Sequence, residues 1–288
     1  MLAILLGVFA ALCWGIHDLV ARMLAAQVGP FRMAALVMVS GAILLSFYVI
    51  YDGAIWNASR EGIISGLLLG VTYGLAVGGL FKAFSLGPIS LVGPLTAGYP
   101  VLAVLWGVFN GLEPTPLQWA CVAATMVGVI IVARSGTEDG GINAVEPGKL
   151  PTLLFFAVLA ALGYSSSIVI GQQAALTVGE VEATWLSRAT GLITLIPFVM
   201  SERKFTPLPR SSWRGIFIMG GLDVLAVIAI NASGHLPGKD FAGIGVSAYG
   251  AVSVVLAMIF LKEKVSPGQW GGLALIVGSV ATLSVAQG

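Results

Sequence analysis

The chain has 288 residues, of which 58% are hydrophobic and only 9% are Asp, Glu, Lys or Arg. A soluble domain carries about 45–50% apolar and about 25% charged residues, so this composition excludes a soluble enzyme, a disordered chain and a nucleic-acid binder with its basic face. Cys13 and Cys121 both lie in apolar runs, which excludes a disulfide scaffold. The composition therefore indicates a polytopic membrane protein.

Apolar segments long enough to cross a bilayer follow one another along the chain. A helix needs about 20 mostly apolar residues to do so. Ten segments qualify, namely Leu2–Ala26, Phe31–Ile50, Gly62–Phe84, Pro88–Phe109, Pro116–Ala133, Leu150–Leu176, Val181–Met200, Trp213–Ser233, Phe241–Leu261 and Ser266–Ala286. Continuous runs of this length favour helices over the alternating strands of a membrane barrel. The predicted fold class is therefore an all-α polytopic membrane protein with ten transmembrane helices.

The basic residues predict an orientation. If both termini face outward, eleven of the 14 basic residues fall on the inner side, whereas Arg60 and Lys239 fall outside and Arg188 lies within a span. Loops rich in Lys and Arg stay on the cytoplasmic side. We therefore expect a multi-pass protein of the inner (plasma) membrane with both termini on the outer side.

The two halves of the chain resemble each other. Moving the first half by 150 positions places Glu113 on Glu263. One inserted residue later, a Pro-x-Gln-Trp motif that begins at Pro116 matches another that begins at Pro267. The repetition of this polar pattern at the same point of each half predicts an internal duplication.

The duplication predicts how the chain is organised. We expect a first five-helix repeat at 1–135, a polar linker at 136–149 and a second five-helix repeat at 150–288. Because each repeat has an odd number of spans, the two insert with opposite orientations. Inverted repeats place a substrate site near the membrane midplane. The predicted architecture is two inverted repeats around a central cavity, an arrangement that suits transport by alternating access.

Several motifs resemble one family of carriers. Trp14-Gly15, the FKAFSLGP sequence of Phe81–Pro88, and Glu113 followed by Gln118-Trp119 are similar to the drug/metabolite transporter superfamily, and more closely to its ten-helix EamA-type exporters. The resemblance implies two five-helix repeats, a cavity lined mainly by the first, third, fourth, sixth, eighth and ninth helices, and export of small metabolites. It also implies amino acids as a substrate class, because amino-acid and aromatic amino-acid exporters belong to this group.

Polar side chains in the first span share one helix face. Trp14, His17, Asp18 and Arg22 are spaced at i, i+3, i+4 and i+8. Their counterparts in the second repeat are Tyr164, Ser167, Ile168 and Gln172. One interpretation is a cavity wall that both repeats contribute to. The other is that Asp18 and Arg22 pair locally while His17 bonds to a neighbouring helix.

Two charges lie deep in the second repeat. Asp223 is near the centre of the eighth span with Asn231 on its face, and Arg188 lies in the seventh span beside Trp185. An unpaired charge at this depth costs at least about 2.5 kcal/mol, so we expect Arg188 and Asp223 to pair across helices. Asp223 could then face a substrate ammonium or carry a coupling proton. The pair could equally be structural, or Asp223 could be a neutral acid held by hydrogen bonds.

Aromatic and helix-breaking residues occur at mid-depth. Tyr73, Tyr99 and Tyr249 lie away from the interfacial belts where Tyr is usual, and they suit a cavity for amphipathic solutes or packing between helices. Pro94 and Pro100 break the fourth span and predict bending points for gating, or plain helix architecture. Small residues on the third span favour close helix packing, namely Gly62, Gly66, Gly70 and Gly74. Glu113 and Glu263 are expected to fix a loop or a helix N-terminus.

The sequence contains none of the motifs that would indicate an enzyme. It contains no nucleotide-binding glycine loop, nucleophile elbow or metal-spaced cluster, so we predict no catalytic residues, no metal and no cofactor. The predicted function is a transporter that exports small metabolites by alternating access, above all amino acids or related amphipathic metabolites, with aromatic and hydrophobic amino acids as candidates. Its aromatics would contact the apolar part of the solute, and His17, Asp223, Asn231 and Gln172 its polar groups.

The expected partners are the small-molecule substrate and the lipid bilayer, with protons as a candidate coupling ion and no nucleic acid. A monomer is sufficient for this function. A broad-range drug exporter, or a carrier of sugars or nucleotide derivatives, remains an alternative. A membrane-embedded enzyme or a sensor is the alternative from another class.

Overall fold

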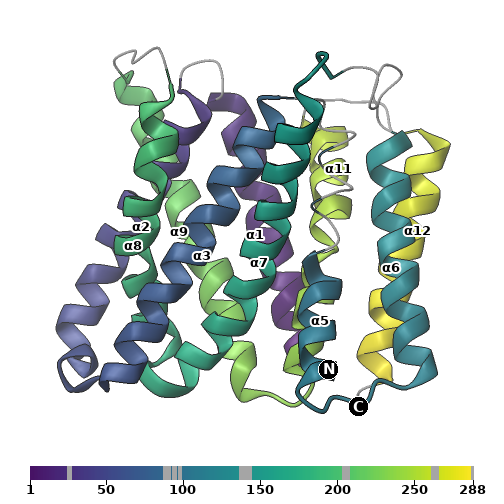
Figure 1. Ribbon diagram of the computed structural model, residues 1–288, viewed down its shortest axis with the longest axis horizontal. Helices are drawn as coiled ribbons and strands as arrows, with labels where there is room; N and C mark the ends of the chain where they lie inside the picture. The colour runs from purple at the N-terminus through teal and green to yellow at the C-terminus, as the bar shows by residue number, and fades with distance from the viewer. Residues whose placement is uncertain are drawn as a thin grey trace.

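The computed structural model describes residues 1–24, 28–86, 92, 96, 99–135, 145–202, 208–260 and 266–286. Within them, every regular element is a helix. The α-helices are α1 (Leu2–Leu24), α2 (Pro30–Asp52), α3 (Arg60–Phe84), α5 (Tyr99–Phe109), α6 (Pro116–Ser135), α7 (Leu150–Val178), α8 (Glu180–Met200), α9 (Arg210–Ala232), α10 (Ala242–Val246), α11 (Tyr249–Phe260) and α12 (Pro267–Val285). Short 3₁₀ helices occupy η1 (Ala54–Asn57), η3 (Ser233–His235) and η4 (Lys239–Phe241). The helices run between the same two ends of one bundle, and both chain termini lie at one of these ends (Figure 1).

The helices follow the predicted spans. Among the described residues, six helices are long and apolar enough to cross a membrane: α1, α2, α3, α7, α8 and α9, the last continued through η3. α6 contains a shorter apolar helix, and α12 occupies the tenth span. The ninth span is not one helix, because a turn at Ser247 and Ala248 separates α10 from α11. α5 is the described end of the fourth span; Pro94, and residues 136–144 of the predicted linker, lie outside the described residues.

The packing of the helices has a two-fold pseudosymmetry that relates the two repeats. Helices at the same place in each repeat are α1 and α7, α2 and α8, α3 and α9, and α6 and α12. α3 packs on α7 and α8 of the other repeat, and its equivalent α9 packs on α1 and α2. The remaining equivalents pack on each other, α2 on α8 and α6 on α12, the second pair visible at one side of the bundle (Figure 1). The predicted all-α architecture of inverted five-helix repeats is confirmed.

Individual contacts repeat as well. A Cβ atom on Gly70 would lie 2.1 Å from Thr190 Oγ1, and one on Gly220 would lie 2.0 Å from Ser40 Oγ. Gly70 and Gly220 are 150 positions apart, as are Ser40 and Thr190. The helices therefore cross at touching distance at two symmetry-related points. The prediction that the glycine face of the third span serves packing is confirmed, since Gly66 and Gly74 also lie against α8, at Leu186 and Thr194 respectively.

The repeated Pro-x-Gln-Trp motif starts a helix in each half. Ser266 Oγ accepts from Gln269 N, and Gln269 Oε1 accepts from Ser266 N at 2.9 Å, which is a capping box. Thr115 and Gln118 make the same two bonds before α6, at 3.3 and 2.8 Å. The glutamine of the motif thus satisfies backbone N–H groups that the helix leaves without partners. The exposed Glu113 precedes this cap, whereas Glu263 lies outside the described residues.

We expect Ser266→Ala and Thr115→Ala each to lower the free energy of unfolding by about 1 kcal/mol, because each removes one bond of a capping box. Unfolding of the purified protein in mild detergent, followed by circular dichroism, measures the change. Ser85→Ala is the control, since its hydroxyl donates to Lys82 O at the end of α3 and caps no helix start. Equal stability of all three variants would contradict this account of the motif.

Candidate functional site

A cavity lies between the two repeats. About 350 Å³ of space is free of protein atoms there, a figure that includes the part open to solvent. The ten residues that line it come from α1, α3, α5, α7 and α9, and they are Trp14, Leu69, Tyr73, Tyr99, Tyr164, Ser167, Ile168, Val227, Ile230 and Asn231.

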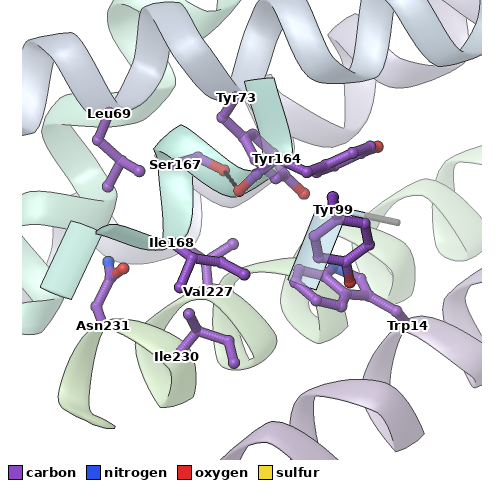
Figure 2. A pocket seen from close by; sticks show the side chains of 10 residues that line it. All are labelled: Trp14, Leu69, Tyr73, Tyr99, Tyr164, Ser167, Ile168, Val227, Ile230 and Asn231. Atoms are coloured by element: carbon purple, nitrogen blue, oxygen red, sulfur yellow. Dashed lines mark hydrogen bonds between the residues drawn. The ribbon is translucent and has the colours of Figure 1, made fainter. Parts of the chain in front are cut away.

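Aromatic rings gather at one end of the cavity (Figure 2). The Tyr164 ring meets the Tyr73 ring edge to face at 6.2 Å, and it lies 5.5 Å from the Tyr99 ring. Trp14 of α1 completes this group beside Tyr99 (Figure 2). Such rings give a large apolar surface with polar atoms at the edge.

Behind the aromatic end lies a buried ion pair. Arg188 Nη1 donates to Asp223 Oδ2 at 2.7 Å, and the two residues are only 1% and 4% exposed. Asp223 Oδ1 accepts from Tyr73 OH at 2.6 Å and from Trp14 Nε1 at 3.0 Å. The predicted pairing of Arg188 with Asp223 is thus confirmed. Two rings that line the cavity donate hydrogen bonds directly to this carboxylate. A change at the ion pair therefore alters the hydrogen bonds that hold two side chains of the cavity wall.

The guanidinium group of Arg188 is incompletely satisfied. Its Cζ atom lies 5.5 Å from the centre of the Tyr73 ring, within the range of a cation–π contact. Its Nε and Nη2 atoms are buried, and they have no hydrogen-bond partner among the described residues. A buried N–H without a partner costs about 1–3 kcal/mol. Arg188 therefore has two donors left for an anionic group that reaches it.

The other end of the cavity carries an amide (Figure 2). Asn231 Nδ2 donates to Thr184 Oγ1 at 3.0 Å, and Thr184 donates to the backbone oxygen of Glu180 at 2.7 Å. Ser167 lies between the two ends and donates to the backbone oxygen of Tyr164. The cavity thus has an aromatic end backed by charges and an aliphatic end with one amide.

Other predicted site residues lie elsewhere. Gln172 Nε2 donates to Ser233 Oγ and to the backbone oxygen of Lys239, so it fastens the segment between η3 and η4. Trp185 Nε1 donates to Ser46 Oγ on α2, at 2.9 Å. Neither is among the residues that line the cavity, and a role for either in binding stays a prediction.

Two further predicted residues gather at Asp18. His17 Nδ1 lies 2.9 Å from Asp18 Oδ1, and Tyr249 donates to Asp18 Oδ2. Neither His17 nor Tyr249 lines the cavity. Pro100 lies in the first turn of α5. The structure thus divides the predicted site into a cavity with an ion pair and a separate group of three side chains.

Leu69, Ile230 and Thr184 were not predicted. Leu69 lies one turn before Tyr73, so helical spacing from a predicted residue could have found it. Ile230 is only the sequence neighbour of Asn231, and neighbours do not share a helix face. An apolar residue that lines a cavity has no sequence signal that separates it from one that packs in the core. Thr184 could not be recognised without its partner Asn231 on another helix.

Comparison with known proteins agrees with this architecture. The model of the EamA-like transporter family matches residues 1–134 and 152–285. The uncharacterized inner membrane transporter YedA of Escherichia coli strain K12 is 23% identical over 300 residues, which cover 98% of this chain and 92% of YedA. The uncharacterized transporter sll1319 of Synechocystis is 26% identical over 240 residues, covering 80% of this chain and 67% of sll1319.

A solved crystal structure shares the fold at 20% sequence identity, with a TM-score of 0.81 over 99% of this chain and 97% of the other. The family match covers nearly the whole chain, and the relatives named above are described as transporters. The chain therefore belongs to the EamA-like transporter family and is a multi-pass membrane transporter.

Proposed function

We propose that this transporter exports amino acids with aromatic or other large apolar side chains, by alternating access around the cavity. The observation that carries the proposal is the cluster of four aromatic rings, two of which donate hydrogen bonds to Asp223 of the buried Arg188–Asp223 pair. The rings would hold the apolar part of the solute. In this proposal both termini lie on the outer side of the inner membrane, as the basic residues predict.

The ion pair supports a zwitterionic solute. A free amino acid carries one ammonium and one carboxylate, the same two charges as Arg188 and Asp223 together. The ammonium could join the Asp223 carboxylate, and the carboxylate could accept from the Nε and Nη2 atoms of Arg188. Such an exchange leaves no unpaired charge in the membrane, where one would be costly.

A second candidate is a carrier of neutral drugs. None of the ten lining residues is charged, so a neutral amphipathic molecule would meet no charge in the cavity wall and would leave the ion pair in place. The two candidates differ in a clear way: an amino acid must reach Arg188 and Asp223, whereas a neutral drug need not.

Ligand-induced stabilisation of the purified protein separates these candidates. We expect phenylalanine, tryptophan and leucine to raise the melting temperature with a saturable dependence, and glycine to have little effect, because binding to the folded state adds RT ln(1 + [L]/Kd). Chloramphenicol serves as the neutral drug and UDP-glucose as the nucleotide derivative. Stabilisation by chloramphenicol alone would favour the second candidate.

Two matched tyrosine variants test whether phenylalanine binds in the cavity. Tyr164 lines the cavity, whereas Tyr51 is 92% exposed at the end of α2. Tyr164→Leu should weaken the stabilisation by phenylalanine about tenfold in apparent Kd, equivalent to about 1.4 kcal/mol, and Tyr51→Leu should leave it unchanged. An equal loss in both variants would contradict binding in the cavity.

A further inference from the structure

Three side chains from two spans meet beside the cavity. His17 and Asp18 lie in α1, and Tyr249 is the first residue of α11. Asp18 Oδ1 contacts His17 Nδ1 at 2.9 Å, and Asp18 Oδ2 accepts from the Tyr249 hydroxyl. The side chains of His17 and Asp18 are 16% and 39% exposed, so the group is less buried than the ion pair behind the cavity.

These contacts favour one tautomer of His17. An ionised carboxylate only accepts hydrogen bonds, so His17 must carry its hydrogen on Nδ1 to donate to Asp18. The Nε2 atom of the neutral ring is then left with a free lone pair. A proton added there gives an imidazolium beside the Asp18 carboxylate, and the existing hydrogen bond becomes charge-assisted. His17 is therefore oriented to accept a proton.

Asp223 is less suited to this role. Its two oxygens already accept from Arg188, Tyr73 and Trp14, and the residue is 4% exposed. Protonation of Asp223 would leave the Arg188 guanidinium without a counter-charge inside the membrane, where an unpaired charge is costly. His17 and Asp18 together gain a charge pair on protonation, whereas Arg188 and Asp223 lose one.

The same group connects to a break in the ninth span. The turn at Ser247 and Ala248 directly precedes Tyr249, and Ser247 Oγ is buried without a hydrogen-bond partner in the described part of the chain. The turn separates α11 from α10, and the first residue of α11 is held to α1 by Asp18. Trp14, one turn before Asp18 on α1, bonds to Asp223. α1 thus links this group to the ion pair and the cavity.

Other titratable groups surround it. Asp223 of α9 acts electrostatically on His17, and Tyr164 of α7 interacts with Asp18. Arg22 follows Asp18 by one turn in α1. α11 contributes Tyr249 itself. The proton affinity of His17 is therefore set by Asp18 and Asp223 together.

We propose that His17, Asp18 and Tyr249 form a proton-binding site that couples a proton gradient to movement of α11 against α1. Binding of the proton to His17 changes the charge next to the Asp18–Tyr249 contact that joins the two helices. The consequence for transport rests on the proposed function, but the proton site itself does not.

Histidine spectroscopy tests the site without any substrate. The chain has two histidines, so His235→Gln leaves His17 as the only one. In lipid, its ¹⁵N resonances should report the Nδ1–H tautomer at high pH and a single protonation step between about pH 5 and about pH 8. Asp18→Asn should shift the midpoint by about one pH unit or more. An Nε2–H tautomer, or a ring that does not titrate, would overturn the proposal.

Flux in proteoliposomes tests the coupling. The readout is the ratio of phenylalanine accumulation driven by a pH gradient to phenylalanine exchange without one. Asp18→Asn and Tyr249→Phe should lower this ratio about tenfold, with Tyr249→Phe retaining the His17 titration. Asp52→Asn, at the exposed end of α2, is the matched control and should keep the ratio.

An unchanged ratio in Asp18→Asn would overturn the coupling. Absence of phenylalanine flux in every protein, including the unsubstituted one, would instead count against the proposed function. In that case the histidine titration still decides whether the proton site exists.

Discussion

Arg188→Met is expected to lower the free energy of unfolding by about 3–5 kcal/mol, the largest effect of any single substitution considered for this protein. The cause is the Asp223 carboxylate, which stays buried but loses the Arg188 guanidinium that lies 2.7 Å away. Met is the residue at the equivalent position of the first repeat, Met38, so the helix environment accommodates its size and shape. Unfolding of the purified protein in bicelles measures the change.

The double variant Arg188→Met/Asp223→Asn separates structure from function. Asn keeps an oxygen that can accept from Trp14 and Tyr73 but carries no charge, so no ion is left unpaired. We expect this variant to recover most of the stability lost in Arg188→Met, because replacing a buried ion pair by neutral groups is often neutral or stabilising. If the pair binds the substrate, transport by the stable double variant should still fall at least about tenfold. Transport at the unsubstituted rate would mean that the pair is structural.

Gly70→Ala is expected to disrupt the packing of α3 on α8. The new Cβ would lie 2.3 Å from the backbone oxygen of Ser187 and 2.8 Å from its Cα, and backbone atoms cannot move aside without displacing the helix. Overpacking costs about 1–3 kcal/mol where side chains can adjust. Because this clash is with backbone, we expect a loss at or above the upper end, measured as a lower melting temperature and a smaller yield of monodisperse protein.

Gly278→Ala is the control for that substitution. Gly278 also lies in a helix, α12, but a Cβ there would have nothing within 4 Å. The change should be neutral or slightly stabilising, because Ala favours helix by about 0.8–1.0 kcal/mol over Gly. If both variants lost the same stability, the close crossing would not be what makes Gly70 necessary.

Much of the fold was predictable from the hydrophobicity, charge and glycine spacing of individual segments. Continuous apolar runs must be helices in a bilayer, and the long helices lie where those runs were identified. The cost of an unpaired charge favoured a pair between Arg188 and Asp223, but a neutral Asp223 held by hydrogen bonds was the alternative until the structure showed their contact. The glycine spacing of the third span likewise predicted a packing face before the identity of its partner α8 was known.

Features that depend on distant partners could not be predicted. Gln172 is polar and lies at the helical spacing expected of the cavity wall. Its amide is nevertheless bound to Ser233 and to the Lys239 backbone. Trp185 was placed near the site by its proximity to Arg188, yet its indole points to Ser46 of α2. The polar atoms of both side chains are committed to contacts that only the folded chain brings together.

The Pro-x-Gln-Trp motif shows a different limit. Its repetition at Pro116 and Pro267 revealed the duplication, but the pattern alone did not show what it does. The structure gives the reason: the glutamine three residues after Thr115 or Ser266 closes a capping box at a helix start. A motif that recurs in both repeats can therefore be purely structural.

Counterflow of radiolabelled phenylalanine in proteoliposomes tests the central claim most directly. The account predicts saturable uptake into vesicles preloaded with unlabelled phenylalanine, with competition by tryptophan and leucine but not by glycine. Half-saturation should need about tenfold more phenylalanine in Tyr164→Leu and should not change in Tyr51→Leu. Vesicles that contain folded, monodisperse protein yet show no saturable exchange of any of these amino acids would contradict it.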